Sequence, residues 1–270
     1  MRFQDAAPDA RAIVYAGIQA DPLVARAADL LAGASLDQRV LARAAMNGES
    51  TDADAWRTMF PSLFGPDADA PTRAVSEAIL EASLEVAERG EQVRSQFRGA
   101  IVEALTERLL RSGLAGAGPA AVRRERRILF DGVRAEIHPY DVTVEVDGAA
   151  VAIDCKWGAR GISADVLHQL DDARQHAADD DEPLAVVLVV FDAARSCDVR
   201  LDRQTAPRDA RSQCGPTSST RWTTPTTRST STGSRRQPWR LRRTALGASS
   251  RRFRDAIGSS TLRPPMRGWS

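Results

Sequence analysis

The first part of the chain carries apolar residues with the spacing of amphipathic helices. Between about residues 8 and 48 the sequence is rich in Ala, Leu and Arg, and apolar residues recur at positions i, i+3 and i+4. This pattern predicts helices over ARAIVYAGIQ and over PLVARAADLLAGASLDQRVLARAAM. Asp21 and Pro22 suit the start of the second segment, because aspartate caps a helix and proline fits its first position.

The next segment, residues 48–71, is interrupted by Gly and Pro and is predicted to be a loop with an aromatic cluster of Trp56, Phe60 and Phe64. Helical spacing then returns over residues 72–92 and 93–113, and Gly113 is a typical helix end. We therefore expect a helical N-terminal region over residues 1–92, followed by a further helix that opens the next domain.

Short β-type segments follow a predicted connection, GAGPAAVRRE. RRILFDG, RAEIHPYDVTVEV and AAVAIDCKWG are rich in β-branched residues, and Asp147-Gly148 between the last two predicts a two-residue hairpin. ISADVLHQLDDARQHA is helical in spacing, and PLAVVLVVFD has the continuous apolar run of a strand that is buried on both faces. The order of helix, strands, helix and strand predicts a mixed α/β core over residues 93–200.

The last part of the chain, residues 201–270, has a different composition. From residue 202 onwards it holds 15 of the 37 basic residues and 3 of the 36 acidic ones, which leaves 22 basic and 33 acidic residues before it. It is rich in Ser and Thr and lacks sustained periodicity, so no packed core is expected. Three interpretations stay open: a basic arm that binds phosphate backbones, an inert disordered tail, and out-of-frame translation of a GC-rich gene.

Composition narrows the class of protein. No apolar run approaches the roughly 20 residues that cross a bilayer, and no signal peptide is evident, so we expect a cytoplasmic protein without a membrane partner. Three cysteines without paired spacing indicate neither a disulfide framework nor a cysteine zinc site. The single lysine is the most unusual feature, because every other basic residue is arginine and this one, Lys156, follows Asp154 by two positions.

The predicted hairpin brings this lysine close to two carboxylates. Pairing symmetrically about Asp147-Gly148 places Asp141 opposite Asp154, with side chains on one face about 5 Å apart. Asp154 and Lys156 share a face because strand side chains alternate. Two carboxylates so close favour a hard divalent cation such as Mg²⁺, and an adjacent ammonium group can stabilise the charge that develops on a phosphate. Together these groups suit metal-assisted hydrolysis of a phosphodiester.

At these residues the sequence resembles the PD-(D/E)XK nucleases, a superfamily with the restriction-endonuclease-like fold. Pro139-Tyr140-Asp141 and Asp154-Cys155-Lys156 carry the resemblance, with one residue between the Pro and the Asp that are often adjacent. GAIVEALTERLLRSG matches the family's frame of a glutamate, two leucines and a glycine, with Glu103 as the acid. Gln169 falls where a glutamine is common on the following helix. The similarity covers roughly residues 94–192.

The resemblance implies roles for these residues. Asp141 and Asp154 would bind the metal, Lys156 would be the catalytic lysine, Glu103 an accessory ligand of the metal or of water, and Gln169 a supporting polar residue. The sequence departs from the pattern in using Asp rather than Glu before the lysine. A helical wheel places Glu103 opposite the apolar stripe of its helix, so Glu107 remains an alternative.

We therefore expect a Mg²⁺-dependent nuclease, with Mn²⁺ as a substitute, that hydrolyses DNA and has restriction, defence or repair as candidate roles. The alternatives are a catalytically inactive restriction-endonuclease-like module that binds DNA, and a non-enzymatic helical interaction protein. The N-terminal helices could serve as a scaffold, a recognition module or a homodimer interface. The net charge of −11 before residue 202 opposes DNA binding unless basic patches such as VRRERR offset it.

Overall fold

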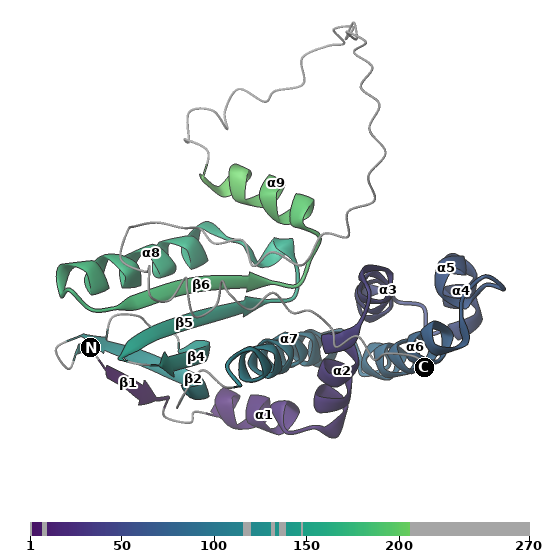
Figure 1. The fold of residues 1–270 in the computed structure, drawn as a ribbon, viewed down its shortest axis with the longest axis horizontal. Coiled ribbons are helices and arrows are strands. Elements are labelled where there is room, and N and C mark those ends of the chain that lie inside the picture. Colours follow the sequence, from purple (N-terminus) through teal and green to yellow (C-terminus); the bar gives the residue numbers. More distant parts are fainter. Residues whose placement is uncertain are drawn as a thin grey trace, which may run out of the picture.

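A mixed β-sheet and a group of N-terminal helices meet at one long helix, α7 (Glu91–Gly113), in the computed structural model of the protein (Figure 1). Helix α7 contacts three earlier helices, α1 (Ala10–Gln19), α2 (Pro22–Gly33) and α6 (Ala70–Ala87), and three strands, β2 (Ala120–Phe130), β4 (Tyr140–Val146) and β5 (Ala149–Lys156). It is therefore the element through which the two parts of the fold are joined. The structure describes residues 2–6, 10–115, 120–130, 133–134, 139–146 and 148–205.

Six helices precede α7 in the described part of the chain, and four of them begin after a capping side chain. Asp21 accepts a hydrogen bond from the Leu23 N–H at 2.9 Å, which confirms the predicted start of the second helix. The long segment expected to follow is interrupted, because Ser35 forms a capping box with Gln38 and begins a new helix. The helices are α1 (Ala10–Gln19), α2 (Pro22–Gly33), α3 (Leu36–Asn47), α4 (Ala53–Met59), α5 (Pro61–Phe64) and α6 (Ala70–Ala87).

The prediction of a loop over residues 48–71 was wrong in part, because α4 and α5 lie within it. Asp52 caps α4 by accepting hydrogen bonds from the backbone N–H groups of Asp54 and Ala55. Trp56 is buried at 7% exposure and lies against Phe60. Burial of one large aromatic side chain thus stabilises a helix that its short periodic pattern did not reveal.

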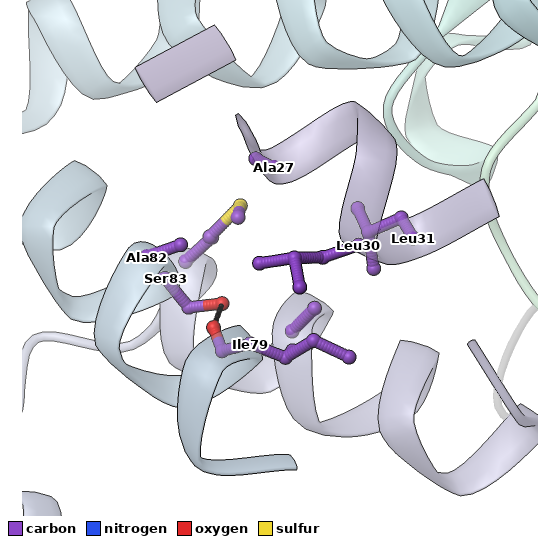
Figure 2. A pocket seen from close by; sticks show the side chains of 8 residues that line it. Ala27, Leu30, Leu31, Ile79, Ala82 and Ser83 are labelled. Carbon is purple, nitrogen blue, oxygen red and sulfur yellow. Dashed lines mark hydrogen bonds between the residues drawn. The ribbon is translucent and has the colours of Figure 1, made fainter. Parts of the chain in front are cut away.

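The interior between α2, α3 and α6 is largely apolar. Figure 2 shows its lining, in which Leu30, Leu31 and Ile79 meet small alanine side chains. The Ser83 hydroxyl is the polar group in this lining, and it donates to the Ile79 carbonyl at 2.6 Å within its own helix. The proton of this buried hydroxyl is thus already engaged within its own helix.

The sheet has the strand order β1-β2-β4-β5-β6, with the short β3 paired to β2. Neighbouring strands are antiparallel except for β5 and β6, which are parallel. The fold is therefore mixed α/β, as predicted. The strands are β1 (Arg2–Asp5), β2 (Ala120–Phe130), β3 (Val133–Arg134), β4 (Tyr140–Val146), β5 (Ala149–Lys156) and β6 (Leu184–Val190).

Two strands depart from the predictions. β1 lies in the N-terminal region that we expected to be helical, and it is too short for its pattern to show in the sequence. β2 begins at Ala120, inside the segment expected to be a connection. Its arginine-rich sequence is accommodated because Arg124 pairs with Glu107 of α7 and Arg126 pairs with Glu145 of β4. Ion pairs across the sheet therefore permit a strand where a basic run indicated a loop.

The hairpin between β4 and β5 has the predicted register. The pairs run from Val142 with Ile153 to Val146 with Ala149, and Gly148 in the turn has a φ of 74°. Continuing this register by one position places Asp141 opposite Asp154.

The two faces of the sheet are covered by different helices (Figure 1). Helix α7 packs on one face against residues that include Val142, Val144 and Ile153. Helix α8 (Ala164–Asp179) packs on the other face, where Ala173 and Ala177 contact Ala152 and its neighbours.

β6 was expected to be buried on both faces, and this prediction is confirmed only in part, because its side chains pack against the core on both faces of the sheet but are not fully buried. All seven of its residues are only half-buried, because β6 lies at the edge of the described sheet and pairs with β5 alone. The following helix, α9 (Ala194–Thr205), has no buried residue and extends past the predicted start of the tail at residue 201. The rest of the tail lies outside the described residues. Within the described ranges, no helix has the length and apolar character needed to cross a membrane.

Candidate metal centre

Three carboxylates from three elements converge beside the sheet. Glu103 comes from the middle of α7, Glu125 from β2 and Asp141 from the start of β4, and each offers an oxygen within 4.8 Å of the others. We call these three residues the carboxylate cluster. Oxygen donors at this spacing form a ligand set for a hard divalent cation.

The backbone of β2 changes the direction of its side chains at Glu125. Val122 packs on the α7 face, whereas Ile128 and Phe130 pack on the α8 face. In a regular strand, residues an even number of positions apart lie on the same face, so the alternation is reversed between Val122 and Ile128. Glu125 lies between them and has a φ of 52°, a left-handed conformation that is rare for a residue with a side chain. Such a conformation costs about 1–3 kcal/mol and persists only where the surrounding structure imposes it.

β4 reverses its alternation at the same level. Tyr140 packs on the α8 face and Val142 on the α7 face, so the change falls at Asp141. The pairs of Arg124 with Val142 and of Arg126 with Tyr140 flank this level, which places Glu125 and Asp141 opposite each other. Both strands thus turn an acidic side chain toward Glu103 without a shift in register.

Helix α1 supplies hydrogen-bond donors to two members of the cluster, Glu103 and Glu125. Glu103 is 4% exposed, and the Tyr15 hydroxyl donates to its Oε1 at 2.5 Å. The Gln19 amide donates to Glu103 Oε2 at 2.8 Å and to Glu125 Oε1 at 3.2 Å. Glu103 is buried because it lies between α1 and the strands that carry Glu125 and Asp141, which is why a helical wheel alone left its environment undecided.

A second acidic group adjoins the cluster at the end of β5. The Cys155 N–H donates to Asp141 Oδ2 at 2.5 Å, and Lys156 Nζ pairs with Asp154 Oδ1 at 2.6 Å. Within the described part of the chain, Asp154 Oδ2 is buried and has no hydrogen-bond partner. Asp154 is not one of the three mutually close carboxylates, but its charge acts on Asp141.

Burial and nearby like charges disfavour the ionised forms of these carboxyl groups, so their pKa values are raised. Burial, opposed by the hydrogen bonds from Tyr15 and Gln19, raises the pKa of Glu103 to about 6. Burial, together with the charges of Glu103 and Asp154, raises the pKa of Asp141 well above its usual range. Burial also raises the pKa of Glu125. A group of acids that repel one another is stabilised by a cation between them.

Lys156 is held in its cationic form. Burial acts to lower its pKa, but the carboxylates of Asp154 and Asp141 outweigh this effect, so the pKa is raised. The lysine therefore carries a positive charge and does not act as a base near neutral pH.

A short turn after β5 confines the lysine side chain. The 3₁₀ turn η1 (Ala159–Gly161) passes over Lys156, and a Cβ added at Gly161 would lie 2.8–2.9 Å from three carbons of that side chain. Asp192 anchors the turn by accepting a hydrogen bond from the Ala159 N–H at 2.9 Å, and Arg43 of α3 pairs with Asp192 at 2.5 Å. The N-terminal helices thus help to fix the position of the lysine.

The structure places the remaining predicted residues as follows. Glu107, the alternative to Glu103, is engaged in ion pairs with Arg111 and Arg124 and is not a member of the cluster. Gln169 lies half-buried on α8, the helix that covers the opposite face of the sheet from α7.

Sequence reasoning missed two contributions to the site. Glu125 was read as part of a basic patch, although it is the single acid within VRRERR and a lone acid among arginines is a signal for a specific role. Tyr15 and Gln19 were missed because their partners lie 84 to 106 residues away in the sequence.

Comparison of the chain with family models, with curated proteins and with solved structures gave no match. The chemistry of the site therefore rests on its own geometry.

The residues present suit a divalent cation with oxygen ligands. The cluster offers three carboxylates, and the buried Asp154 Oδ2 beside it lacks a donor. A buried acceptor without a partner is costly unless a cation or water satisfies it. Mg²⁺ and Mn²⁺ match this donor set, whereas the absence of histidine and cysteine from the cluster does not favour zinc.

Proposed function

We propose that the protein is a Mg²⁺-dependent nuclease that hydrolyses phosphodiester bonds of DNA. The observation that carries this proposal is the convergence of Glu103, Glu125 and Asp141 next to the ion pair of Asp154 with Lys156. The element order α7, β2, β4, β5, α8 and β6 supports a restriction-endonuclease-like core, since it is the helix, strands, helix and strand order on which the resemblance rests.

The residues of the site have different roles in the proposed reaction. Glu103, Glu125 and Asp141 would hold the cation, and Asp154 would add its buried Oδ2 or orient a water molecule. A bound Mg²⁺ supplies Lewis acidity and lowers the pKa of water near it. Lys156, kept cationic by Asp154, stabilises the negative charge that develops on the phosphate. η1 limits the movement of the lysine, so this charge is in place before the reaction begins.

A plasmid-cleavage assay tests the proposal. The wild-type protein should convert supercoiled DNA to nicked or linear forms with Mg²⁺ or Mn²⁺ and lose this activity with EDTA. Lys156→Ala and Asp154→Ala should each reduce the rate about 100-fold or more. Asp171→Ala is the matched control, because Asp171 is an exposed acid on α8 that pairs only with Arg174 among the described residues. Wild-type protein that never cleaves DNA in the presence of either metal contradicts the proposal.

A DNA-binding module without catalysis is the second candidate. The Tyr15 and Gln19 donors engage both oxygens of Glu103, which favours a carboxylate that is held by protein groups rather than by a cation. This candidate predicts retardation of DNA in a gel without cleavage, and retardation that Lys156→Ala leaves unchanged.

A further inference from the structure

We propose that Tyr15 and Gln19 of α1 are positioning residues of the metal centre, which orient Glu103 and Glu125 for a divalent cation. This inference rests on the proposed function, because it assigns a task to residues around the same cation. It goes beyond that function in making the N-terminal helix part of the site.

The two donors act from one face of a short helix. Tyr15 and Gln19 are four residues apart, so their side chains lie on the same side of α1. Tyr15 Oη reaches Glu103 Oε1 at 2.5 Å, and Gln19 Nε2 reaches Glu103 Oε2 at 2.8 Å. Each oxygen of the most deeply buried carboxylate thus has its own donor, and the orientation of the carboxylate plane is fixed.

Gln19 also connects two carboxylates that repel each other. Its amide nitrogen lies 2.8 Å from Glu103 Oε2 and 3.2 Å from Glu125 Oε1. An amide donor between two acids offsets part of their repulsion without adding a charge that would compete with a cation. The same amide thus contacts the side chain of the residue whose backbone is strained, with a φ of 52°.

Helix α7 is shaped to admit the tyrosine. Gly99 lies one turn before Glu103, and a Cβ added there would lie 2.9 Å from Tyr15 Oη. Any larger residue at this position would push the phenol away from the carboxylate. By contrast, Ile13 and Val14 on the outer face of α1 are 63% and 60% exposed, whereas Ile18 packs against the core. The contacts of α1 are thus concentrated on the carboxylate side.

The affinity for Mn²⁺, measured by electron paramagnetic resonance on the full chain, tests the inference. Tyr15→Phe removes the hydroxyl and keeps the ring, and Gln19→Met removes the amide at similar length. Each variant should bind Mn²⁺ about 10-fold to 100-fold more weakly, as is typical when a group that orients a metal ligand is lost. Val14→Ala, on the exposed face of the same helix, should bind with wild-type affinity.

A merely structural role for α1 predicts a different result. It would lower the melting temperature of the metal-free variants without changing their Mn²⁺ affinity once they are folded. Under the positioning role, raising the Mn²⁺ concentration in proportion to the lost affinity should restore cleavage by Tyr15→Phe. Unchanged or tighter Mn²⁺ binding by both variants would overturn the inference.

The outcomes separate the inference from the proposed function. Wild-type protein that binds Mn²⁺, with weaker binding by the two variants but no cleavage of DNA, sustains the inference and contradicts the nuclease. Cleavage of DNA by the wild-type protein, together with unaltered Mn²⁺ binding by the variants, sustains the nuclease and contradicts the inference. Wild-type protein that binds no Mn²⁺ overturns both.

Discussion

Two buried regions have opposite effects on the stability of the fold. One is the interior between α2, α3 and α6, and the other is the carboxylate cluster. The first is lined by side chains such as Leu31 and Ile79, and its buried hydroxyl is satisfied within its own helix. The second brings together like charges and a strained backbone at Glu125. Apolar burial stabilises the fold, whereas the cluster is maintained at a cost, which is typical of functional sites.

The largest effect is expected from the apolar interior. Leu31 is 1% exposed, and Leu31→Ala leaves a cavity between α2, α3 and α6. The free energy of unfolding should fall by about 3 kcal/mol in urea denaturation. The Mn²⁺ affinity of the folded variant should be unchanged, and a parallel loss of affinity would show that the two regions are coupled.

Removing charge from the carboxylate cluster should stabilise the metal-free protein, in contrast to the loss of stability expected from Leu31→Ala. The pKa of Glu103 in the folded protein is about 6, above the value of 4.5 for an unperturbed group. As the pH falls, Glu103 therefore binds a proton at a higher pH in the folded protein than in the unfolded chain. The stability of the metal-free protein should therefore rise as the pH falls from above 6 to below 4.5, by about 2 kcal/mol from this group.

The measurement compares urea denaturation of the wild type and of Glu103→Gln across this pH range in EDTA. The difference in the free energy of unfolding between the two proteins should shrink as the pH falls, and Glu103→Gln should be the more stable at neutral pH. A variant that is less stable than the wild type at neutral pH without metal would contradict a costly cluster.

The position of Lys156 should be sensitive to the turn above it. Gly161→Ala would place a methyl group 2.8 Å from Lys156 Cβ, so the side chain must move. We expect cleavage to fall about tenfold, because a displacement of this size misplaces the charge that the reaction needs. The free energy of unfolding should also fall by about 1 kcal/mol or more, because the closest atom is Lys156 Cβ, which is fixed to the backbone and cannot move aside as the end of the side chain could. Normal cleavage would show that this contact does not determine activity.

The smallest effect is expected from relief of backbone strain. Glu125→Gly should stabilise the metal-free protein by about 1 kcal/mol, because glycine adopts a positive φ without strain. Arg123→Gly on the same strand is the matched control, since Arg123 is exposed and its φ is not positive, and it should destabilise by a similar amount. Equal destabilisation by both substitutions would show that Glu125 is not strained.

Local patterns predicted much of the fold. The Asp21 cap, the hairpin register about Gly148 and the end of α7 at Gly113 depend on residues close in sequence, and the structure confirms them. The departures from the predictions lie where distant residues decide. β6 has a core-like sequence but lies at an edge, and β2 has a loop-like composition but pairs its arginines with acids on α7 and β4.

The candidate site shows the same division. By itself the sequence determined that Asp141 and Asp154 stand on paired strands with Lys156 two residues further on, because a two-residue turn sets the register of a hairpin. Only the tertiary structure decided that Glu103 rather than Glu107 joins Asp141, that Glu125 turns toward them, and that α1 covers the group. These outcomes depend on how α1 and β2 pack around α7, and no periodicity within one segment encodes a contact between segments about 100 residues apart.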